Sequence, residues 1–142
     1  MRLWHKNLIE VLPSIVLLHL WKECCDISKR FGDLNEIQYF DGRNYVVISR
    51  VQFSTYCRMV HGELINRGWP CNISDVSKWL GEFEECKDND IFSTWHNNAY
   101  LWRCYDALEE MLDYGEISKD DFARVLGYFS KEETCIAADD SH

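Results

Sequence analysis

The chain has 142 residues, 46% of them hydrophobic and 14% aromatic, which is enough apolar material for one domain with its own core and excludes a disordered chain. Its formal net charge is −9 at pH 7. Residues 1–80 carry ten Lys and Arg against eight Asp and Glu, whereas residues 81–142 carry five against sixteen, so any nucleic-acid surface is expected in the first half.

The first predicted element is a helix at about 14–30. Pro13 followed by Ser14 is a helix-start signal, and apolar residues then recur every three or four positions until Gly32 ends the helix. The polar side chains fall at complementary offsets and are expected on the opposite, solvated face: His19, Lys22, Glu23, Asp26 and Arg30.

A long irregular connection is predicted near 31–50, because this stretch contains turn signals at Gly32 and at Asp41-Gly42. The short β-branched run at 46–48 gives it one strand-like piece. The next helix is predicted at 51–67, where apolar residues again repeat with helical period and Gly68 follows in the position of a left-handed C-cap.

The pattern in the second half of the sequence predicts further helices, which are shorter and more acidic than the first two. Asn72 and Ser74 can cap a short helix that runs to Phe83, and the acidic stretch EFEECKDNDI after it indicates an exposed loop. A longer amphipathic helix is expected over 100–112 and ends near Gly115.

Ser118 and Asp121 resemble a capping box that starts a final helix through Phe129. Together the elements predict an all-α fold, a compact single-domain helical bundle of four to five helices over residues 1–130. The acidic tail at 131–142 is expected to be frayed.

The seven cysteines are odd in number and form no Cys-x-x-Cys pair, and no charged-then-apolar leader marks export. Reduced thiols and a cytoplasmic location are therefore expected. Apolar stretches such as SIVLLHLW are interrupted before the roughly 20 residues that a membrane span needs, so no membrane partner is expected.

The beginning of the chain carries the most specific pattern. It reads MRLWH, then Leu12-Pro13, then Leu-Leu at 17–18 and KECC at 22–25, and the second predicted helix ends in INRGW. Over residues 1–70 this pattern resembles bacterial and phage proteins related to the pyrimidine-dimer DNA glycosylases of the phage endonuclease V type.

The resemblance implies an all-α fold with the amino terminus inserted into the active site, base excision by the α-amino group, and strand cleavage at the abasic product. It implies that the α-amine of Met1 is the nucleophile and that Glu23 is the essential carboxylate, with Arg2 and Lys22 contacting phosphate. The candidate DNA-binding residues are basic side chains at the chain start and on the polar face of the first helix: Arg2, His5, Lys6, Lys22 and Arg30.

General chemistry is consistent with these roles. An α-amino group with a pKa of about 7.7 to 8.0 is roughly a quarter neutral near pH 7.4, whereas a lysine amine is neutral in only about one molecule in a thousand. Attack on the sugar C1′ displaces the base and leaves an iminium, which acidifies the neighbouring carbon so that the 3′ phosphate can leave. Glu23 would stabilise the cationic sugar and then move a proton. Trp4, Trp21 or Trp69 would offer a stacking surface for an unstacked base.

Each of these residues also has an ordinary structural interpretation. Lys22 and Glu23 can be a solvated pair, Arg2 and Lys6 solvated terminal charges, and His5 a local hydrogen-bonding group. The adjacent cysteines at 24–25 point about 100° apart on a helix, so core packing explains them better than a metal site, and no cofactor is expected.

A second function class is left open. A catalytically silent binding protein on the same scaffold would use its acidic half to engage a basic protein partner, as a phage-type inhibitor or nucleic-acid mimic.

Overall fold

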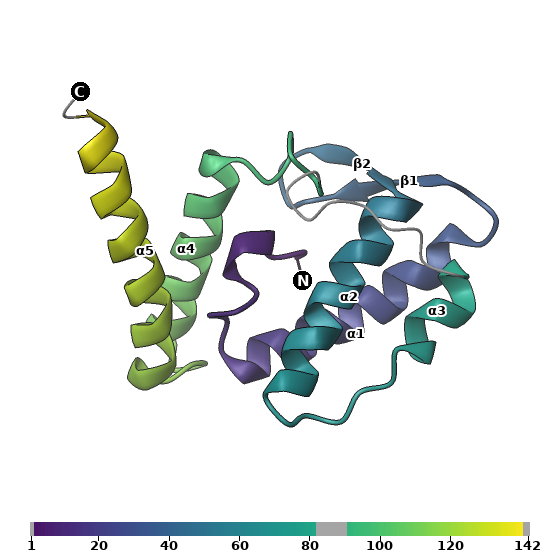
Figure 1. Cartoon of the computed structure of the whole chain (residues 1–142), viewed down its shortest axis with the longest axis horizontal. Coiled ribbons are helices and arrows are strands. Elements are labelled where there is room, and N and C mark those ends of the chain that lie inside the picture. Colours follow the sequence, from purple (N-terminus) through teal and green to yellow (C-terminus); the bar gives the residue numbers. More distant parts are fainter. Residues whose placement is uncertain (1, 82–90, 141–142) are drawn as a thin grey trace.

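The computed structural model describes residues 2–81 and 91–140, with side chains described as far as residue 131. Within these residues the chain forms five α-helices, a two-stranded antiparallel sheet and one short 3₁₀ turn (Figure 1). In chain order the elements are η1 (Lys6–Leu8), α1 (Ser14–Phe31), β1 (Glu36–Phe40), β2 (Tyr45–Ser49), α2 (Arg50–Asn66), α3 (Ser74–Leu80), α4 (Asn98–Asp113) and α5 (Lys119–Asp140).

The two helices predicted at 14–30 and 51–67 are confirmed as α1 and α2. Helix α1 ends at Gly32, whose φ of 51° is a conformation that glycine adopts without strain. Helix α2 begins where the Ser49 hydroxyl accepts a 3.2 Å hydrogen bond from the Gln52 amide, and Gly68 follows its end with a φ of 82°.

The predicted helical fold is confirmed in part: the strand-like piece expected at 46–48 is β2, but it pairs with a second strand, β1, so the connection at 31–50 is not irregular and the fold is not purely all-α. Strands β1 and β2 form a hairpin in which Ile37 pairs with Ile48, and both side chains are buried against the helices. The buried Asp41 closes the turn, because its Oδ1 accepts hydrogen bonds from the amides of Arg43 at 2.8 Å and Asn44 at 2.7 Å. The fold is therefore largely helical with one small sheet.

The short third helix is confirmed as α3, which ends at Leu80. The predicted continuation to Phe83 and most of the predicted acidic loop lie outside the described residues. The capping box also forms, since the Asp121 amide donates to the Ser118 hydroxyl at 3.1 Å. Helix α5 then continues to Asp140, through most of the tail that was expected to be frayed.

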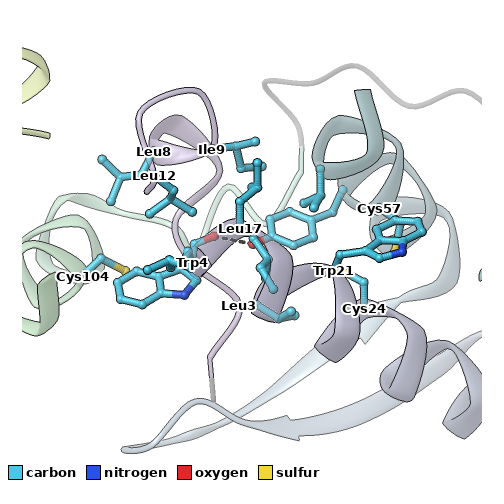
Figure 2. Packing of buried hydrophobic residues seen from close by; sticks show 14 of the residues in the cluster. Leu3, Trp4, Leu8, Ile9, Leu12, Leu17, Trp21, Cys24, Cys57 and Cys104 are labelled. Atoms are coloured by element: carbon cyan, nitrogen blue, oxygen red, sulfur yellow. Dashed lines mark hydrogen bonds between the residues drawn. The ribbon is translucent and has the colours of Figure 1, made fainter. Parts of the chain in front are cut away.

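The helices form two groups with the beginning of the chain between them. Helices α1, α2 and α3 pack on one another, the hairpin lies on α1 and α2, and α4 packs with α5 (Figure 1). Residues 3–12, here called the N-terminal segment, run between α4 on one side and α1 and α2 on the other. Leu3, Leu8 and Leu12 of this segment are completely buried (Figure 2).

Arg67 ties this segment to the end of α2. Its guanidinium donates to the carbonyl oxygens of Leu12 at 2.6 Å and Glu10 at 3.0 Å, and its Nε contacts the Glu63 carboxylate at 2.9 Å. Neither carbonyl has a strand or helix partner, so Arg67 supplies a hydrogen bond to the buried Leu12 and shares the exposed Glu10 carbonyl with Arg124. None of the described helices is long and apolar enough to cross a membrane.

Candidate active site

Two buried tyrosines hold the start of the N-terminal segment from opposite sides. The Tyr56 hydroxyl, on α2, donates to the Trp4 carbonyl oxygen at 2.6 Å (dashed in Figure 2). The Tyr100 hydroxyl, on α4, donates to the Leu3 carbonyl oxygen at 2.6 Å. Because all four residues are buried, these bonds fix the position of the backbone that leads to Arg2.

His5 and His96 form a stacked pair next to these tyrosines, with ring centroids 5.0 Å apart. The Asn7 amide donates to His5 Nδ1 at 3.1 Å, so the proton of His5 is on Nε2, which donates to the His96 carbonyl oxygen at 2.8 Å. The Lys6 amide donates to His96 Nδ1 at 3.0 Å, and the Lys6 ammonium donates to the Ile91 carbonyl oxygen at 2.6 Å. The side chains of His5 and Lys6 thus anchor the segment to the chain at 91–96.

Both imidazoles are kept neutral by their surroundings. Burial lowers the pKa of His5 to about 4, an effect opposed by its hydrogen bond to the His96 backbone and reinforced by the charge of Lys6. Burial, followed by repulsion from His5 and Lys6, lowers the pKa of His96 to about 2. Neither group is poised to exchange protons near neutral pH, which favours an anchoring role over acid–base catalysis.

Arg2 directly precedes the N-terminal segment, and its guanidinium lies 5.3 Å from the centre of the Trp4 ring. Its Nη1 is buried and has no hydrogen-bond partner among the described residues. A buried guanidinium nitrogen without an acceptor is costly, because it has lost water without gaining a bond.

Glu23 lies half-buried on α1, and Tyr39 of β1 connects it to the chain start. Burial, followed by the negative charge of Glu23, raises the pKa of Tyr39 to about 12. A hydrogen bond from the Leu3 backbone and the positive charge of Arg2 act on the same phenol in the opposite direction. The charges of Glu23 and Arg2 therefore act on the same buried side chain in opposite directions.

A cavity of about 650 Å³ opens beside Arg2. One wall consists of Arg2 and Trp4, the α1 residues Val16, His19 and Leu20, and the hairpin residues Phe40, Asp41 and Gly42. The other wall consists of Ala107, Glu110 and Met111 of α4 and of Tyr114 and Glu116 after it. Glu23 follows His19 by four positions and Leu20 by three, so it continues the face of α1 that lines the cavity.

The other predicted DNA-binding residues, Lys22 and Arg30, are exposed on α1. Arg30 donates to the Gln38 carbonyl oxygen at 2.8 Å, which places it beside the hairpin. Of the tryptophans considered for stacking, Trp4 and Trp21 are buried and Trp69 is exposed. Trp4 combines burial with a place in the cavity wall. Met1, the predicted nucleophile, lies outside the described residues.

Comparison with known protein families gives a match to pyrimidine dimer DNA glycosylase over residues 1–76, which is more than half of the chain. The chain belongs to this family. It is accordingly related to DNA-repair glycosylases, with DNA as the substrate that the family indicates. No curated protein and no solved structure matches the chain.

The family match ends within α3, so much of the site comes from outside it. Helix α4 contributes Tyr100 to the anchoring of the segment and Glu110 to the cavity, and His96 precedes that helix. In this member of the pyrimidine dimer DNA glycosylase family, α4 therefore supplies one side of the site.

Sequence reasoning missed Tyr39, Tyr56, Tyr100 and His96, although each contacts the N-terminal segment or the groups around Glu23. Tyr56 and Tyr100 lie in predicted helices and His96 lies close to one, and an aromatic side chain at such a position is normally interpreted as part of the hydrophobic core. The tyrosine hydroxyl could have indicated these contacts. A buried tyrosine needs a hydrogen-bond acceptor, and the irregular backbone of residues 3–12 offers carbonyl oxygens that no helix or strand uses.

Proposed function

We propose that this chain is a DNA glycosylase with AP-lyase activity that uses the α-amine of Met1 as nucleophile and Glu23 as acid and base. Family membership supports the glycosylase part of this proposal. The observation that supports the mechanism is that Tyr56 and Tyr100 fix the Trp4 and Leu3 backbone next to Arg2, while the charges of Arg2 and Glu23 both act on the Tyr39 phenol. The proposed nucleophile belongs to the residue before Arg2.

In the proposed reaction the amine nitrogen attacks C1′ of the damaged nucleotide. The bond between C1′ and the base breaks, and its electron pair leaves with the base. Opening of the sugar gives an iminium between the amine nitrogen and C1′. Loss of a proton from C2′ to a base then allows the C3′–O bond to break, and the 3′ phosphate leaves.

Glu23 is the group proposed to receive the C2′ proton. Its position on a regular helix, half-buried beside Tyr39, supports this role because a general base needs a fixed position and restricted solvation. Tyr39 acts as a positioning residue in this scheme. With a pKa of about 12 it keeps its proton, so it remains an uncharged neighbour of the Glu23 carboxylate.

The basic side chains are proposed to act in two ways. Lys22 and Arg30, which are exposed on α1, contact the DNA backbone, and Arg2 contacts a phosphate or carbonyl oxygen in the cavity. His5 and Lys6 hold the N-terminal segment through His96 and Ile91. Direct DNA contact by these two residues stays a prediction.

The test is borohydride trapping on duplex DNA that contains an abasic site or a thymine dimer. Borohydride reduces the iminium to a stable amine, so the proposal expects a covalent complex whose attachment site, by peptide mass analysis, is the Met1 amine. Glu23→Gln should form little cleaved product, whereas Glu36→Gln, an exposed glutamate on β1, should cleave normally. Absence of a crosslink at Met1 would reject the mechanism.

One feature favours the alternative of an acidic binding protein. Helix α4 exposes Asp106, Glu109, Glu110 and Asp113. A basic protein partner would fit this face. Extra residues added before Met1 separate the two functions, because they would block the amine and abolish cleavage while leaving the acidic face unchanged.

A further inference from the structure

The end of the β hairpin exposes two aromatic rings, here called the aromatic tip. Phe40 and Tyr45 pair across the two strands with ring centroids 5.1 Å apart, and they are 51% and 72% exposed. Val47 continues the same outer face, since it is exposed and pairs with Gln38 two positions further along the strands. Contiguous apolar side chains on an exposed face mark an interaction site, whereas single ones need no explanation.

The aromatic tip is held in place by bonds to α4 and to the segment before it. Asp41 directly follows Phe40, and its Oδ2 accepts a hydrogen bond of 3.2 Å from Trp95 Nε1 and lies 3.6 Å from a guanidinium nitrogen of Arg103. Its Oδ1 accepts from two amides of the turn. A ligand that stacks on the tip therefore meets a turn whose backbone is already fixed, which lowers the entropy cost of binding.

The aromatic tip borders the residues proposed to carry out the reaction. Phe40 lines the cavity of about 650 Å³ that Arg2 and Trp4 also line. Its neighbour in the strand, Tyr39, is buried, and the charges of Glu23 and Arg2 both act on the Tyr39 phenol. DNA that places a nucleotide at Glu23 would therefore bring the adjoining bases close to Phe40.

Other aromatic side chains are less suited to stack on a base at this place. Trp4 and Trp21 are buried, and Trp69 is exposed but does not line the cavity. Tyr114 is exposed in the cavity wall that carries two glutamates, whose charges repel the phosphates of DNA. Stacking needs an aromatic face that a base can cover, and the tip offers two such faces side by side.

A positive charge lies next to the aromatic tip. Arg43 is exposed in the turn between the two rings, and its guanidinium has no hydrogen-bond or ionic partner among the residues that the structure describes. The acid nearest to it in the turn, Asp41, is already paired with Arg103. Glu36, the other acid of the hairpin, precedes Phe40 by four positions, roughly 13 Å along the strand. Arg43 is therefore available to a phosphate.

We propose that the aromatic tip is the surface on which this chain stacks an exposed base of duplex DNA, next to the nucleotide bound at Glu23. Unstacking that nucleotide leaves the adjoining base without a neighbour, and Phe40 and Tyr45 replace part of the lost stacking. Arg43 contacts a phosphate beside the same base. The inference rests on the proposed function, and it adds a group that selects damaged over intact DNA, because an intact duplex offers no free base face.

The test measures binding without catalysis. Fluorescence anisotropy gives the affinity of the full chain for two duplexes, one intact and one with a tetrahydrofuran residue, an abasic-site analogue that has no aldehyde for an amine to attack. We expect the analogue duplex to bind at least about tenfold more tightly. Phe40→Thr with Tyr45→Thr should remove this preference and change the affinity for the intact duplex by less than about twofold, because only the stacked base is lost.

Matched variants separate stacking from charge and from loss of the fold. Threonine suits a β-strand, and thermal unfolding followed by circular dichroism shows whether the double variant folds. Tyr45→Thr alone, at the more exposed position, should lose part of the preference, and Tyr45→Phe should keep it. Arg43→Gln should weaken the binding of both duplexes by the same factor and reduce its salt dependence. Trp79→Ala, which removes an exposed ring from α3, should change neither affinity.

Three results would overturn the inference: equal affinity of the unmodified chain for the two duplexes, a preference that survives in the double variant, or an equal loss of affinity for both duplexes in that variant. A surviving preference together with a dimer that the double variant loses, seen by sedimentation, would assign the aromatic tip to a second copy of the chain. Borohydride trapping reports on the lyase mechanism separately, because it needs the Met1 amine. Trapping without the duplex preference rejects only this inference, and the preference without trapping rejects only the mechanism.

Discussion

The Tyr100 hydroxyl lies 2.6 Å from the carbonyl oxygen of Leu3, a residue 97 positions earlier in the chain. Helix α4 has no extensive direct packing on α1 or α2, so contacts of this kind attach it to the rest of the molecule through the N-terminal segment. The position of the chain start and the position of α4 therefore depend on each other.

Replacing this hydroxyl tests that dependence. Tyr100→Phe leaves the Leu3 carbonyl buried without its donor, and we expect the free energy of unfolding to fall by roughly 1 to 3 kcal/mol. Urea denaturation followed by circular dichroism measures the change. Tyr45→Phe removes an exposed hydroxyl and should change stability little; equal effects in the two variants would contradict a role for the buried bond.

A substitution at Arg67 tests how much the attachment of the N-terminal segment contributes to stability. Arg67→Lys keeps the charge but cannot reach Leu12, Glu10 and Glu63 together, so we expect a loss of about 2 kcal/mol in unfolding free energy. Arg43→Lys, at an exposed position in the hairpin turn, is the matched control. An unchanged denaturation midpoint in Arg67→Lys would show that the carbonyls find other donors.

The buried histidines predict that stability falls in mild acid. An unfolded histidine has a pKa of about 6.5, whereas the folded-state pKa is about 4 for His5 and about 2 for His96. Above pH 6.5 both histidines are neutral in the folded chain and in the unfolded chain, so they do not make the unfolding free energy depend on pH. From pH 6.5 down to about 4 the unfolded chain binds protons that the folded chain does not, which costs up to about 1.4 kcal/mol per pH unit for each histidine.

The measurement is the unfolding free energy between pH 7.5 and pH 5, a range chosen to lie above most carboxylate titration. His5→Gln should have a shallower slope than the unmodified chain, and His19→Gln, at an exposed position, should keep the full slope. A flat profile in the unmodified chain would mean that both imidazoles are free to protonate in the folded state.

The arrangement around Glu23 makes a spectroscopic prediction that does not depend on catalysis. Because the charge of Glu23 is the second contribution to the raised pKa of Tyr39, Glu23→Gln should lower that pKa by a fraction of a pH unit, while burial keeps it above the usual value. Carbon NMR of labelled tyrosines, assigned with Tyr39→Phe, follows the titration. Glu36→Gln, on the same strand as Tyr39, should leave it unchanged.

The parts of the fold that local pattern encodes were predictable. Helices α1 and α2 have apolar residues at every third or fourth position and a glycine after the last turn, and both were predicted within one residue of their observed bounds. The strand-like piece at 46–48 was predicted, but strand β1 and its pairing with β2 were missed because few residues of the hairpin point inward. Ile37, Tyr39 and Ile48 are too few to establish an alternating pattern against the turn signals around them.

The residues of the candidate site were predictable only within residues 1–70, the part of the chain that the family resemblance covers. The resemblance named Arg2 and Glu23, whose charges both act on the pKa of Tyr39, and their roles in catalysis and DNA binding stay predictions. Tyr100 and His96 could not be anticipated, since their partners lie 97 and 90 positions away and no local period links them. The catalytic role of Met1 stays a prediction.

The order in which a ribosome makes the chain gives the N-terminal segment a further consequence. Leu3 and His5 are synthesised before their partners, because Tyr100 and His96 follow 97 and 91 positions later. Arg124, which donates to the Glu10 carbonyl oxygen, follows 114 positions later. The segment cannot dock completely until residue 124 has been synthesised, because its partners do not exist before then. Until that point the apolar side chains of the segment stay without their binding partners on the growing chain.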